Sequence, residues 1–328
     1  MKAIKFFAIS AMAAAMITSC SSEDELSQSN YPSDNIVRVT AGVNNAKTRA
    51  EGQGVTAMDK PFSLTIVNKN APKYTYTDKV FSKTSGDWAC SETLLWQKSD
   101  ALVDIVAFAP AQTGKFNGVY ANGSIQPIAY SVAKDQTTAD DKNDLLYYYA
   151  KDFNPGESLD KGKLKIQFNH AFCMIDINVT LGTEFNKPEV LKESPIVKVT
   201  LGGTKIAANV NVTNAASVVT ISETDAATDI TTTKGSFDKA ADPEANAKSH
   251  FSCIAIPQTV GANTFKVSLM TAGKRYEWTS DKEITLQSGY RYTLNLSMGN
   301  DVVLLKGGSI SASPWTEGDT GDKPLETD

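Results

Sequence analysis

Histidine and cysteine are the residues of this chain with the most specific chemistry. Its two histidines each precede a cysteine by three positions, as His170-x-x-Cys173 and His250-x-x-Cys253. Two imidazoles and two thiolates would suit a tetrahedral zinc ion. Both pairs fall on predicted strands, however, where residues three apart point to opposite faces. We therefore expect no metal and no cofactor. The cysteines should pack as small apolar side chains in a core, and the histidines should make polar contacts where strands begin.

Catalytic chemistry has little support elsewhere in the chain. The sequence contains no Gly-x-Ser-x-Gly elbow, His-Glu-x-x-His motif, phosphate-binding loop or dinucleotide fingerprint. Two acidic clusters could bind Ca²⁺ weakly, but neither has the spacing of a known calcium loop, so we expect solvated loops. The clusters are Asp140, Asp141 and Asp144, and Glu317, Asp319 and Asp322. We expect no catalytic residue, and we do not expect an enzyme.

The N-terminal stretch contains the strongest motif. Lys2 and Lys5 precede an apolar run at 6–17, and Ile17-Thr18-Ser19-Cys20 follows. A basic start, a short apolar run and small residues before a cut describe a secretory signal, here residues 1–19. Ile-Thr-Ser-Cys resembles the lipobox of bacterial lipoproteins, in which the new N-terminal cysteine is acylated. Cys20 is therefore the predicted lipidation site, with an ordinary signal peptide and an incidental cysteine as the alternative. The acidic residues 21–25 resemble a surface-export signal of Gram-negative lipoproteins.

The other cysteines do not form a disulfide scaffold. With Cys20 used by lipid, Cys90, Cys173 and Cys253 cannot all pair within the chain. A Cys173–Cys253 bridge and buried free thiols both remain open, because sequence does not fix the pairing.

The net charge of −5 at pH 7 excludes a basic nucleic-acid-binding surface. No second apolar run reaches the roughly 20 residues that a membrane helix needs. We therefore expect no nucleic-acid partner, and attachment to a membrane through the lipid on Cys20 alone.

Short strands separated by polar turns make up the predicted fold. The clearest one runs over 173–181, with its odd-numbered side chains facing inward. Asn117-Gly118 and Asn122-Gly123 are typical of hairpin turns, and residues 222–249 indicate a long loop. This pattern predicts an all-β protein of two tandem antiparallel β-sandwiches. Turn residues at 154–158 place the boundary between residues 50–157 and residues 158–328. Further strands are expected at 36–43, 62–67, 73–77, 102–108, 144–150, 164–168, 251–256 and 290–296.

Four stretches of the sequence resemble the fimbrillin family, the major and minor pilins of anaerobic Gram-negative bacteria. The likeness covers nearly all of the mature chain, and its strength lies in the order of the stretches behind a lipobox. It implies two transthyretin-like sandwiches. The stretches are Leu102-Val103-Asp104-Ile105-Val106-Ala107-Phe108-Ala109-Pro110, Asp144-Leu145-Leu146-Tyr147, Phe168-Asn169-His170-Ala171-Phe172, and the ending from Ser288-Gly289-Tyr290-Arg291-Tyr292 to Pro314-Trp315-Thr316-Glu317-Gly318.

The resemblance also implies how such a subunit is processed. A trypsin-like protease cuts after an arginine in the loop that follows the first strand, which here is Arg49 before Ala50, with Lys47 as the nearby rival. The cut would remove residues 20–49, the tether and the first strand. A C-terminal strand of another subunit would then fill the vacant groove by donor-strand exchange. The donor region is expected within 301–328, with 302–305 and 309–311 as the candidate strands.

A fimbrillin would have other copies of itself or related pilins as partners, and a host or bacterial surface receptor for adhesion. It would be found at the outer membrane and in the fimbrium. Two alternatives remain open. A subunit that anchors the pilus would keep both its lipid and its first strand. A surface glycan-binding lipoprotein would show an exposed row of aromatic side chains.

Overall fold

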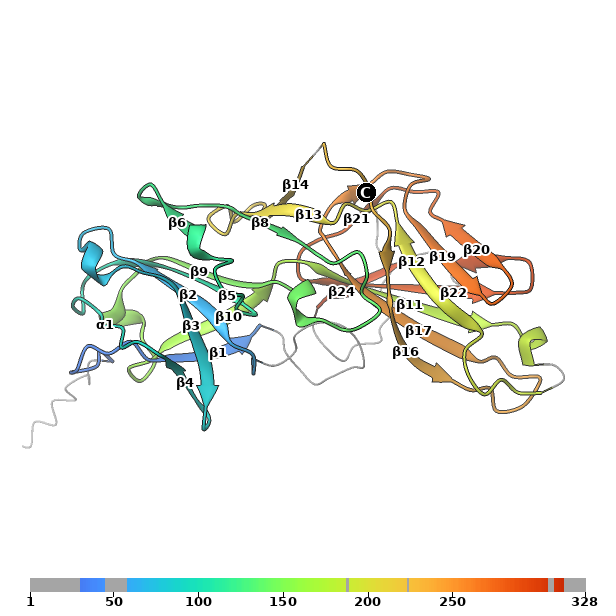
Figure 1. The fold of residues 1–328 in the computed structure, drawn as a ribbon, viewed down its shortest axis with the longest axis horizontal. Coiled ribbons are helices and arrows are strands. Elements are labelled where there is room, and N and C mark those ends of the chain that lie inside the picture. The colour runs from blue at the N-terminus through green and yellow to red at the C-terminus, as the bar shows by residue number, and fades with distance from the viewer. Residues whose placement is uncertain (1–29, 45–57, 187–188, 223, 306–309, 316–328) are drawn as a thin grey trace, which may run out of the picture.

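The computed structural model describes residues 30–44, 58–186, 189–222, 224–305 and 310–315. Within them the protein is almost entirely β, as predicted. The molecule is elongated, with strands β1 to β10 toward one end and strands β11 to β24 toward the other (Figure 1). Both the lipidation site Cys20 and the processing site at Arg49 and Ala50 lie outside the described residues.

The N-terminal half is built on one seven-stranded sheet. Its pairs are antiparallel except for β1 beside β10, which run parallel. In spatial order the strands are β1 (Val39–Val43), β10 (Leu164–His170), β9 (Leu146–Phe153), β5 (Val103–Ala109), β2 (Phe62–Val67), β3 (Tyr76–Thr84) and β4 (Asp87–Cys90).

The C-terminal half packs a six-stranded sheet against a four-stranded one. In the larger sheet β11 and β22 run parallel, so the predicted all-antiparallel pairing is wrong at this pair as well as at β1 and β10. The larger sheet contains β16 (Thr233–Asp238), β17 (Lys248–Ala255), β11 (Cys173–Leu181) and β22 (Tyr290–Met298), with β23 (Val303–Leu305) and β24 (Ser311–Pro314) both beside β22. The smaller sheet contains β15 (Ile230–Thr231), β12 (Ile196–Gly202), β19 (Lys266–Thr271) and β20 (Arg275–Thr279).

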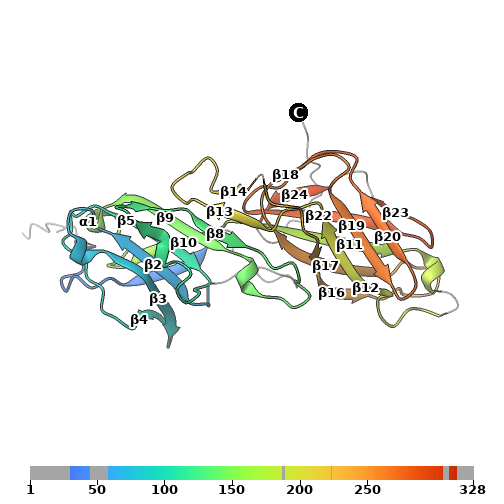
Figure 2. The same cartoon turned by 45° about the horizontal axis from the view of Figure 1, so that its top comes forward.

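A small sheet joins the two halves, because β8 (Ile128–Ser131) of the first half pairs with β13 (Ala207–Val210) of the second (Figure 2). The strand β14 (Val219–Ile221) extends it. Two further pairs are β6 (Tyr120–Ala121) with β7 (Ser124–Ile125), and β18 (Thr259–Val260) with β21 (Ile284–Thr285). The helices are α1 (Pro155–Ser158) and 3-10 turns at Pro72–Tyr74, Asn117–Val119, Asp141–Asn143 and Thr183–Asn186. No helix in the described ranges is long and apolar enough to span a bilayer.

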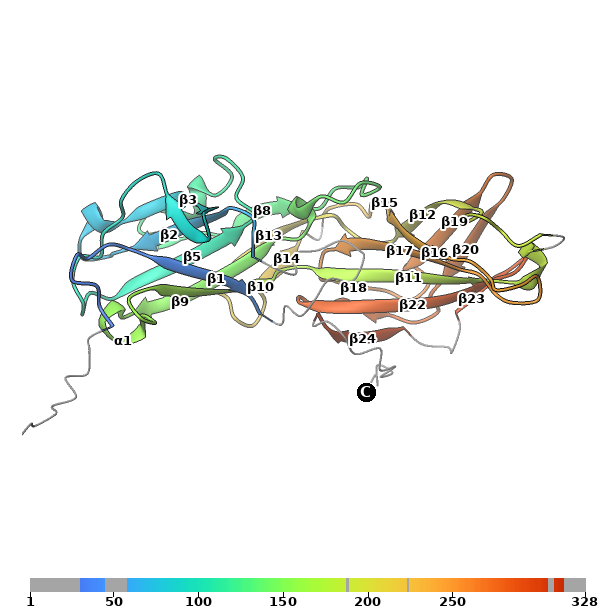
Figure 3. The same ribbon diagram turned by 90° about the horizontal axis from the view of Figure 1, so that it is seen from below.

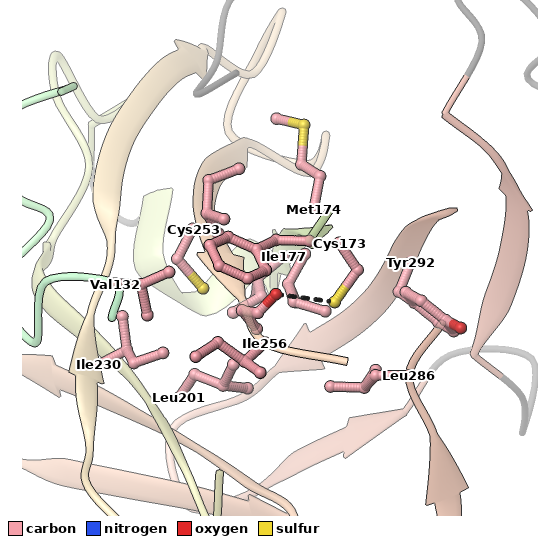
Figure 4. Packing of buried hydrophobic residues seen from close by; sticks show 14 of the residues in the cluster. Val132, Cys173, Met174, Ile177, Leu201, Ile230, Cys253, Ile256, Leu286 and Tyr292 are labelled. Atoms are coloured by element: carbon pink, nitrogen blue, oxygen red, sulfur yellow. Dashed lines mark hydrogen bonds between the residues drawn. The ribbon is translucent and has the colours of Figure 1, made fainter. Parts of the chain in front are cut away.

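Two hydrophobic clusters form the core. The smaller one lies against the seven-stranded sheet and includes Phe62, Trp96 and Phe168. The larger one fills the C-terminal half (Figure 4). It also reaches across the junction to Phe108 and Tyr130. The larger core therefore contains side chains from both halves of the molecule, including residues of β8 and β13.

Sheet membership places the change between the halves at Ala171 and Phe172, between β10 and β11. The boundary drawn from sequence at residue 157 comes earlier, because the turn-forming residues there form the short helix α1 within the first half. The strand that follows, β10, pairs with β9 and β1 of the first half.

Local sequence explains most of the strands. In β11 the side chains of the odd-numbered positions from 173 to 181 are all buried, as their alternation predicts. Asn122 and Gly123 both have positive φ angles, 51° and 77°, and make the tight turn between β6 and β7. The predicted turn at Asn117-Gly118 is wrong, because these residues form a 3-10 turn instead.

Two other expectations are wrong for reasons of packing. Residues 222–249 are not one long loop: β15 and β16 lie within them, and Ile230 is fully buried. The alternating stretch at 73–77 begins as a 3-10 turn, and its strand starts only at Tyr76. At Ile230 a buried apolar side chain decides the structure more than local composition does.

Differences in burial should make Cys90 react with thiol reagents faster than Cys173 and Cys253. Cys173 and Cys253 are fully buried free thiols, whereas Cys90 is half-buried. Burial also raises the pKa of both buried thiols, so the reactive thiolate is disfavoured at neutral pH. In a Cys20→Ser protein, Ellman's reagent should titrate Cys90 in the native state and all three thiols after unfolding in guanidinium. Rapid labelling of all three thiols in the native protein would contradict this core, and Cys90→Ser is the control.

Candidate functional site

The strand β1 is an added edge on the seven-stranded sheet. It runs beside β10 in the register Val39 to Leu164 through Val43 to Phe168. At its two ends the backbone N–H of Leu164 donates to the carbonyl of Arg38 at 2.8 Å, and the N–H of Asn44 donates to that of Phe168 at 2.7 Å. The backbone edge of β10 is therefore satisfied by a segment that comes from the start of the chain.

The residues just before β1 pair with the 94–96 segment, which follows β4 and lies outside the named strands. Ile36 forms a bridge with Leu95, the N–H of Val37 donates to Leu94 at 2.9 Å, and the N–H of Trp96 donates to Asn35 at 2.8 Å. Residues 35–43 thus lie between β10 on one side and the 94–96 segment on the other (Figure 3).

Alternating side chains of this segment close the smaller core. Val37, Val39 and Val43 are buried, while Thr40 between them is exposed. Their neighbours in the cluster include Phe62, Trp96, Leu164, Ile166 and Phe168. Without residues 35–43, both this apolar surface and the backbone edge of β10 would face water.

The C-terminal segment also forms an edge. Both β23 and β24 pair antiparallel with β22, one after the other along the same side of it. In β23 only one face is covered: Val303 is 7% exposed, but Val302 and Leu304 on either side of it are 51% and 58% exposed. A strand that is apolar on both faces is unusual at a sheet edge, where soluble proteins generally place polar or charged residues.

Polar contacts hold the turn that leads into β23. Lys274 donates to the carbonyl of Asn300 at 2.6 Å and forms an ion pair with Asp301 at 2.7 Å. The hydroxyl of Tyr276 donates to the same carbonyl at 2.9 Å, and the N–H of Asn300 donates to Glu184 at 3.0 Å. The contacts of Lys274 and Glu184 are exposed, so each stabilises the turn only modestly, whereas the hydrogen bond of Tyr276 is partly buried.

The histidines do not meet the cysteines that follow them. His170 Nδ1 is bonded to the buried carboxylate of Asp144, and His250 is bonded to Asn178 and Asp238. Cys173 donates its thiol to the carbonyl of Ala255 at 3.2 Å within the larger core (Figure 4). In the described part of the chain, no group of three or more His, Cys, Asp or Glu side chains could hold a metal ion.

The acidic cluster at 140–144 is divided among separate partners. Asp140 accepts from the N–H of Lys142 at the start of a 3-10 turn, Asp141 pairs with Lys60 at 3.3 Å, and Asp144 bonds His170. The cluster at 317–322 lies outside the described residues.

Aromatic side chains are concentrated in the interior. Every Trp and every Tyr of the chain is at least partly covered. Burial raises the pKa of Tyr147 and Tyr148, and it raises the pKa of Tyr130 to about 12 despite a hydrogen bond from Gln112. This arrangement gives the glycan-binding alternative no exposed aromatic platform.

The protein is all-β, and it has β1 at the edge of one sheet and β23 at the edge of another. A fimbrillin-like family model matches residues 48–315, and the chain belongs to this family. No curated protein matches it. Members of this family are fimbrial structural proteins.

Solved structures share the fold. A candidate cell adhesion protein from Bacteroides ovatus is 16% identical, with a TM-score of 0.59 over 87% of this chain and 99% of that one. A second from Bacteroides uniformis is 15% identical, with a TM-score of 0.55 over 87% and 100%. A fimbrial protein from Bacteroides vulgatus is 14% identical, with a TM-score of 0.52 over 86% and 99%.

Sequence reasoning located the first strand but missed what makes the C-terminal segment unusual. The run Val302-Val303-Leu304-Leu305 has no alternation, and this could have marked a strand that buries both faces.

A charge placed on the buried face of β1 should unfold the N-terminal half. We expect Val39→Asp to lower the free energy of unfolding by about 3 kcal/mol or more, because an unpaired carboxylate would enter an apolar core. The neighbouring Thr40→Asp is the matched control and should change it by less than about 0.5 kcal/mol. Urea unfolding monitored by tryptophan fluorescence measures both. Equal effects of the two variants would show that β1 is not seated as described.

Proposed function

We propose that this chain is the precursor of a fimbrial subunit that supports adhesion. It reaches the outer membrane as a lipoprotein, loses its first strand by a cut after Arg49, and joins other subunits by donor-strand exchange. The observation that carries the proposal is the exposure of Val302, which directly precedes the edge strand β23, and of Leu304 within that strand. These side chains are exposed to solvent in the single subunit and would be buried if the segment were inserted into another copy.

The acceptor for such a strand is the place that β1 occupies. Removal of residues 20–49 would leave the edge of β10 and the surrounding apolar side chains uncovered. An incoming strand would restore the backbone hydrogen bonds and bury alternate side chains where Val37, Val39 and Val43 now lie. While β1 is present this surface is covered, which protects the precursor from aggregation before it reaches the cell surface.

Strand directions favour a head-to-tail fibre. β1 runs parallel to β10, β10 leads through Ala171 and Phe172 into β11, and β11 runs parallel to β22 (Figure 3). The segment that follows β22 therefore turns back at the end of the molecule farthest from the start of β1. If released there, it would extend away from its own subunit toward the N-terminal half of the next one, entering in the same direction as β1.

The sequence before β1 supports the earlier steps. The lipobox at Cys20 would attach the precursor to the outer membrane, and β1 ends only a few residues before Arg49. An arginine between threonine and alanine, in a glycine-containing stretch, suits a trypsin-like protease. The second candidate is a subunit that anchors the pilus. It has the same fold and the same lipid but remains uncut, so it would keep β1.

Blocking the cut should stop assembly. The double variant Arg49→Ala, Lys47→Ala should accumulate as a lipidated monomer, because β1 still fills the acceptor groove. SDS-resistant ladders of the surface fraction, resolved without heating, provide the measurement. Ladders of normal length in the double variant would contradict the arginine-loop mechanism. Lys60→Ala, a lysine beyond this loop, is the control and should assemble normally.

Charges on the exposed face of β23 should block assembly without unfolding the subunit. Val302→Asp with Leu304→Asp should change the free energy of unfolding by less than about 0.5 kcal/mol per site, because both side chains already face water. Burying the same charges in a joint is strongly unfavourable, so ladders should be lost.

The matched control is Met270→Asp, which also replaces an exposed apolar residue, 43% accessible, but outside the segment. It should leave both stability and ladders unchanged. Normal ladders in the double variant of β23 would place the donor strand elsewhere.

A further inference from the structure

Three stretches that are far apart in the sequence meet at the junction of the two halves. Asp144 precedes β9, His170 ends β10, and Trp315 follows β24. Each lies in one of the stretches that carried the family resemblance. All three are buried, with exposures of 0%, 7% and 6% respectively. The first two come from the N-terminal half, whereas Trp315 is brought there by the C-terminal segment.

The contacts between them form an ordered stack. Both carboxylate oxygens of Asp144 lie within hydrogen-bonding distance of His170 Nδ1, at 2.9 and 3.0 Å. The indole of Trp315 stacks on the imidazole with 3.8 Å between ring centroids and 15° between planes. The carboxylate fixes the orientation of the imidazole, and the imidazole presents its flat face to the tryptophan.

Backbone bonds attach the stack to the link between the halves. The N–H of Trp315 donates to the carbonyl of Gly289 at 2.6 Å, and the N–H of Gly289 donates to that of Phe172 at 2.9 Å. On the other side, the N–H of Ala171 donates to the carbonyl of Leu145 at 2.8 Å. Trp315 is therefore held near the link between β10 and β11, through its stack on His170 and through Gly289, which is bonded to Phe172.

The rest of the C-terminal segment is held far less firmly. The strand β24 is short, half-buried to exposed, and ends in Pro314, which has no N–H to donate. Val302, which directly precedes β23, and Leu304 within it both have apolar side chains that face water. Between residues 304 and 315, Trp315 is the only buried large side chain among those that the structure describes.

The positions of β23 and β24 along β22 determine which contacts break when the C-terminal segment leaves its own subunit. β23 pairs with the end of β22, and β24 pairs with its beginning, so the chain runs from the tip of the molecule back to the junction. A segment that leaves β22 to reach another subunit must therefore give up the contacts of Trp315 and β24 as well as those of β23.

We propose that Trp315 is a latch that holds the C-terminal segment on its own subunit, with His170 and Asp144 as the residues that position it. Release of the latch is then the step that frees β23 for exchange. This consequence for assembly rests on the proposed function, whereas the anchoring of the segment does not. The latch would keep the exposed apolar side chains of Val302 and Leu304 from binding other molecules until an acceptor groove is available.

The test uses the full chain with Cys20→Ser, and compares Trp315→Ala with Trp315→Phe, which keeps a flat ring for stacking. Hydrogen–deuterium exchange of the uncut protein measures how firmly Trp315 holds the C-terminal segment in place. We expect amides of residues 311–315 to exchange about tenfold faster in Trp315→Ala and within about twofold of the parent protein in Trp315→Phe. Trp278→Ala, a half-buried tryptophan on β20, is the control for general destabilisation and should not alter exchange in this segment. Unchanged exchange in Trp315→Ala overturns the latch.

Limited trypsin digestion of the same proteins reports the consequence for assembly. After the cut at Arg49, Trp315→Ala should form SDS-resistant ladders several-fold faster than the parent protein, while Trp278→Ala should match the parent. Faster exchange combined with unchanged or slower ladder formation would overturn release of the latch as the controlling step. If the cut parent protein forms no ladders, the proposed function fails, and the exchange measurement alone still decides whether Trp315 anchors the segment.

Discussion

The backbone edge of β10 is the constraint on which the rest of the structure depends. A sheet edge with apolar side chains beneath it cannot be left open in water, because its N–H and C=O groups and its core would pair with any available strand. Here a segment from the start of the chain covers the edge, and its valines complete the core. Because β1 lies parallel to β10 at the outside of the sheet, the proposed exchange of β1 for another strand would not require the strands between β10 and β4 to rearrange.

The two ends of the chain are complementary in this respect. The sheet of the N-terminal half is completed by a strand with alternating apolar side chains, and the C-terminal half has an edge strand with apolar side chains on one buried and one exposed face. Within one subunit, β1 pairs with β10 and β23 pairs with β22. Exchange between subunits would replace β1 by a partner strand and would bury Val302 and Leu304. The gain in buried apolar surface would favour the proposed joined state, while the Trp315 stack at the junction would favour the proposed closed one.

The all-β fold and most of the strands could be predicted from the sequence, because alternation in stretches such as 173–181 follows directly from strand geometry. The parallel pairing of β1 with β10 and of β11 with β22 could not, because it depends on contacts between distant segments. The same limit applies to the boundary between the halves: local turn residues at 154–158 were visible, but the pairing partners of β10 were not. Ile230 shows the converse case, where one buried side chain in a polar stretch organises a strand.

The candidate site was predicted unevenly. The position of the first strand followed from the strand pattern of residues 36–43, whereas the donor region followed from the family resemblance; β1 and β23 lie in those stretches. The meeting of Asp144, His170 and Trp315 was not predicted, because a hydrogen bond and a ring stack across 171 residues leave no periodic signal. The sequence suggests for His170 only a zinc ligand or a polar contact where a strand begins, whereas the residue ends β10 and its partners belong to two other stretches.

The central claim is that the first strand is temporary. Sequencing the N-terminus of this protein from purified surface fimbriae tests it most directly. The account predicts a free N-terminus at Ala50, with residues 20–49 absent from the fibre. An acylated Cys20 as the N-terminus of the subunit within the fibre would contradict it, and would instead support a pilus anchor that keeps both its lipid and β1.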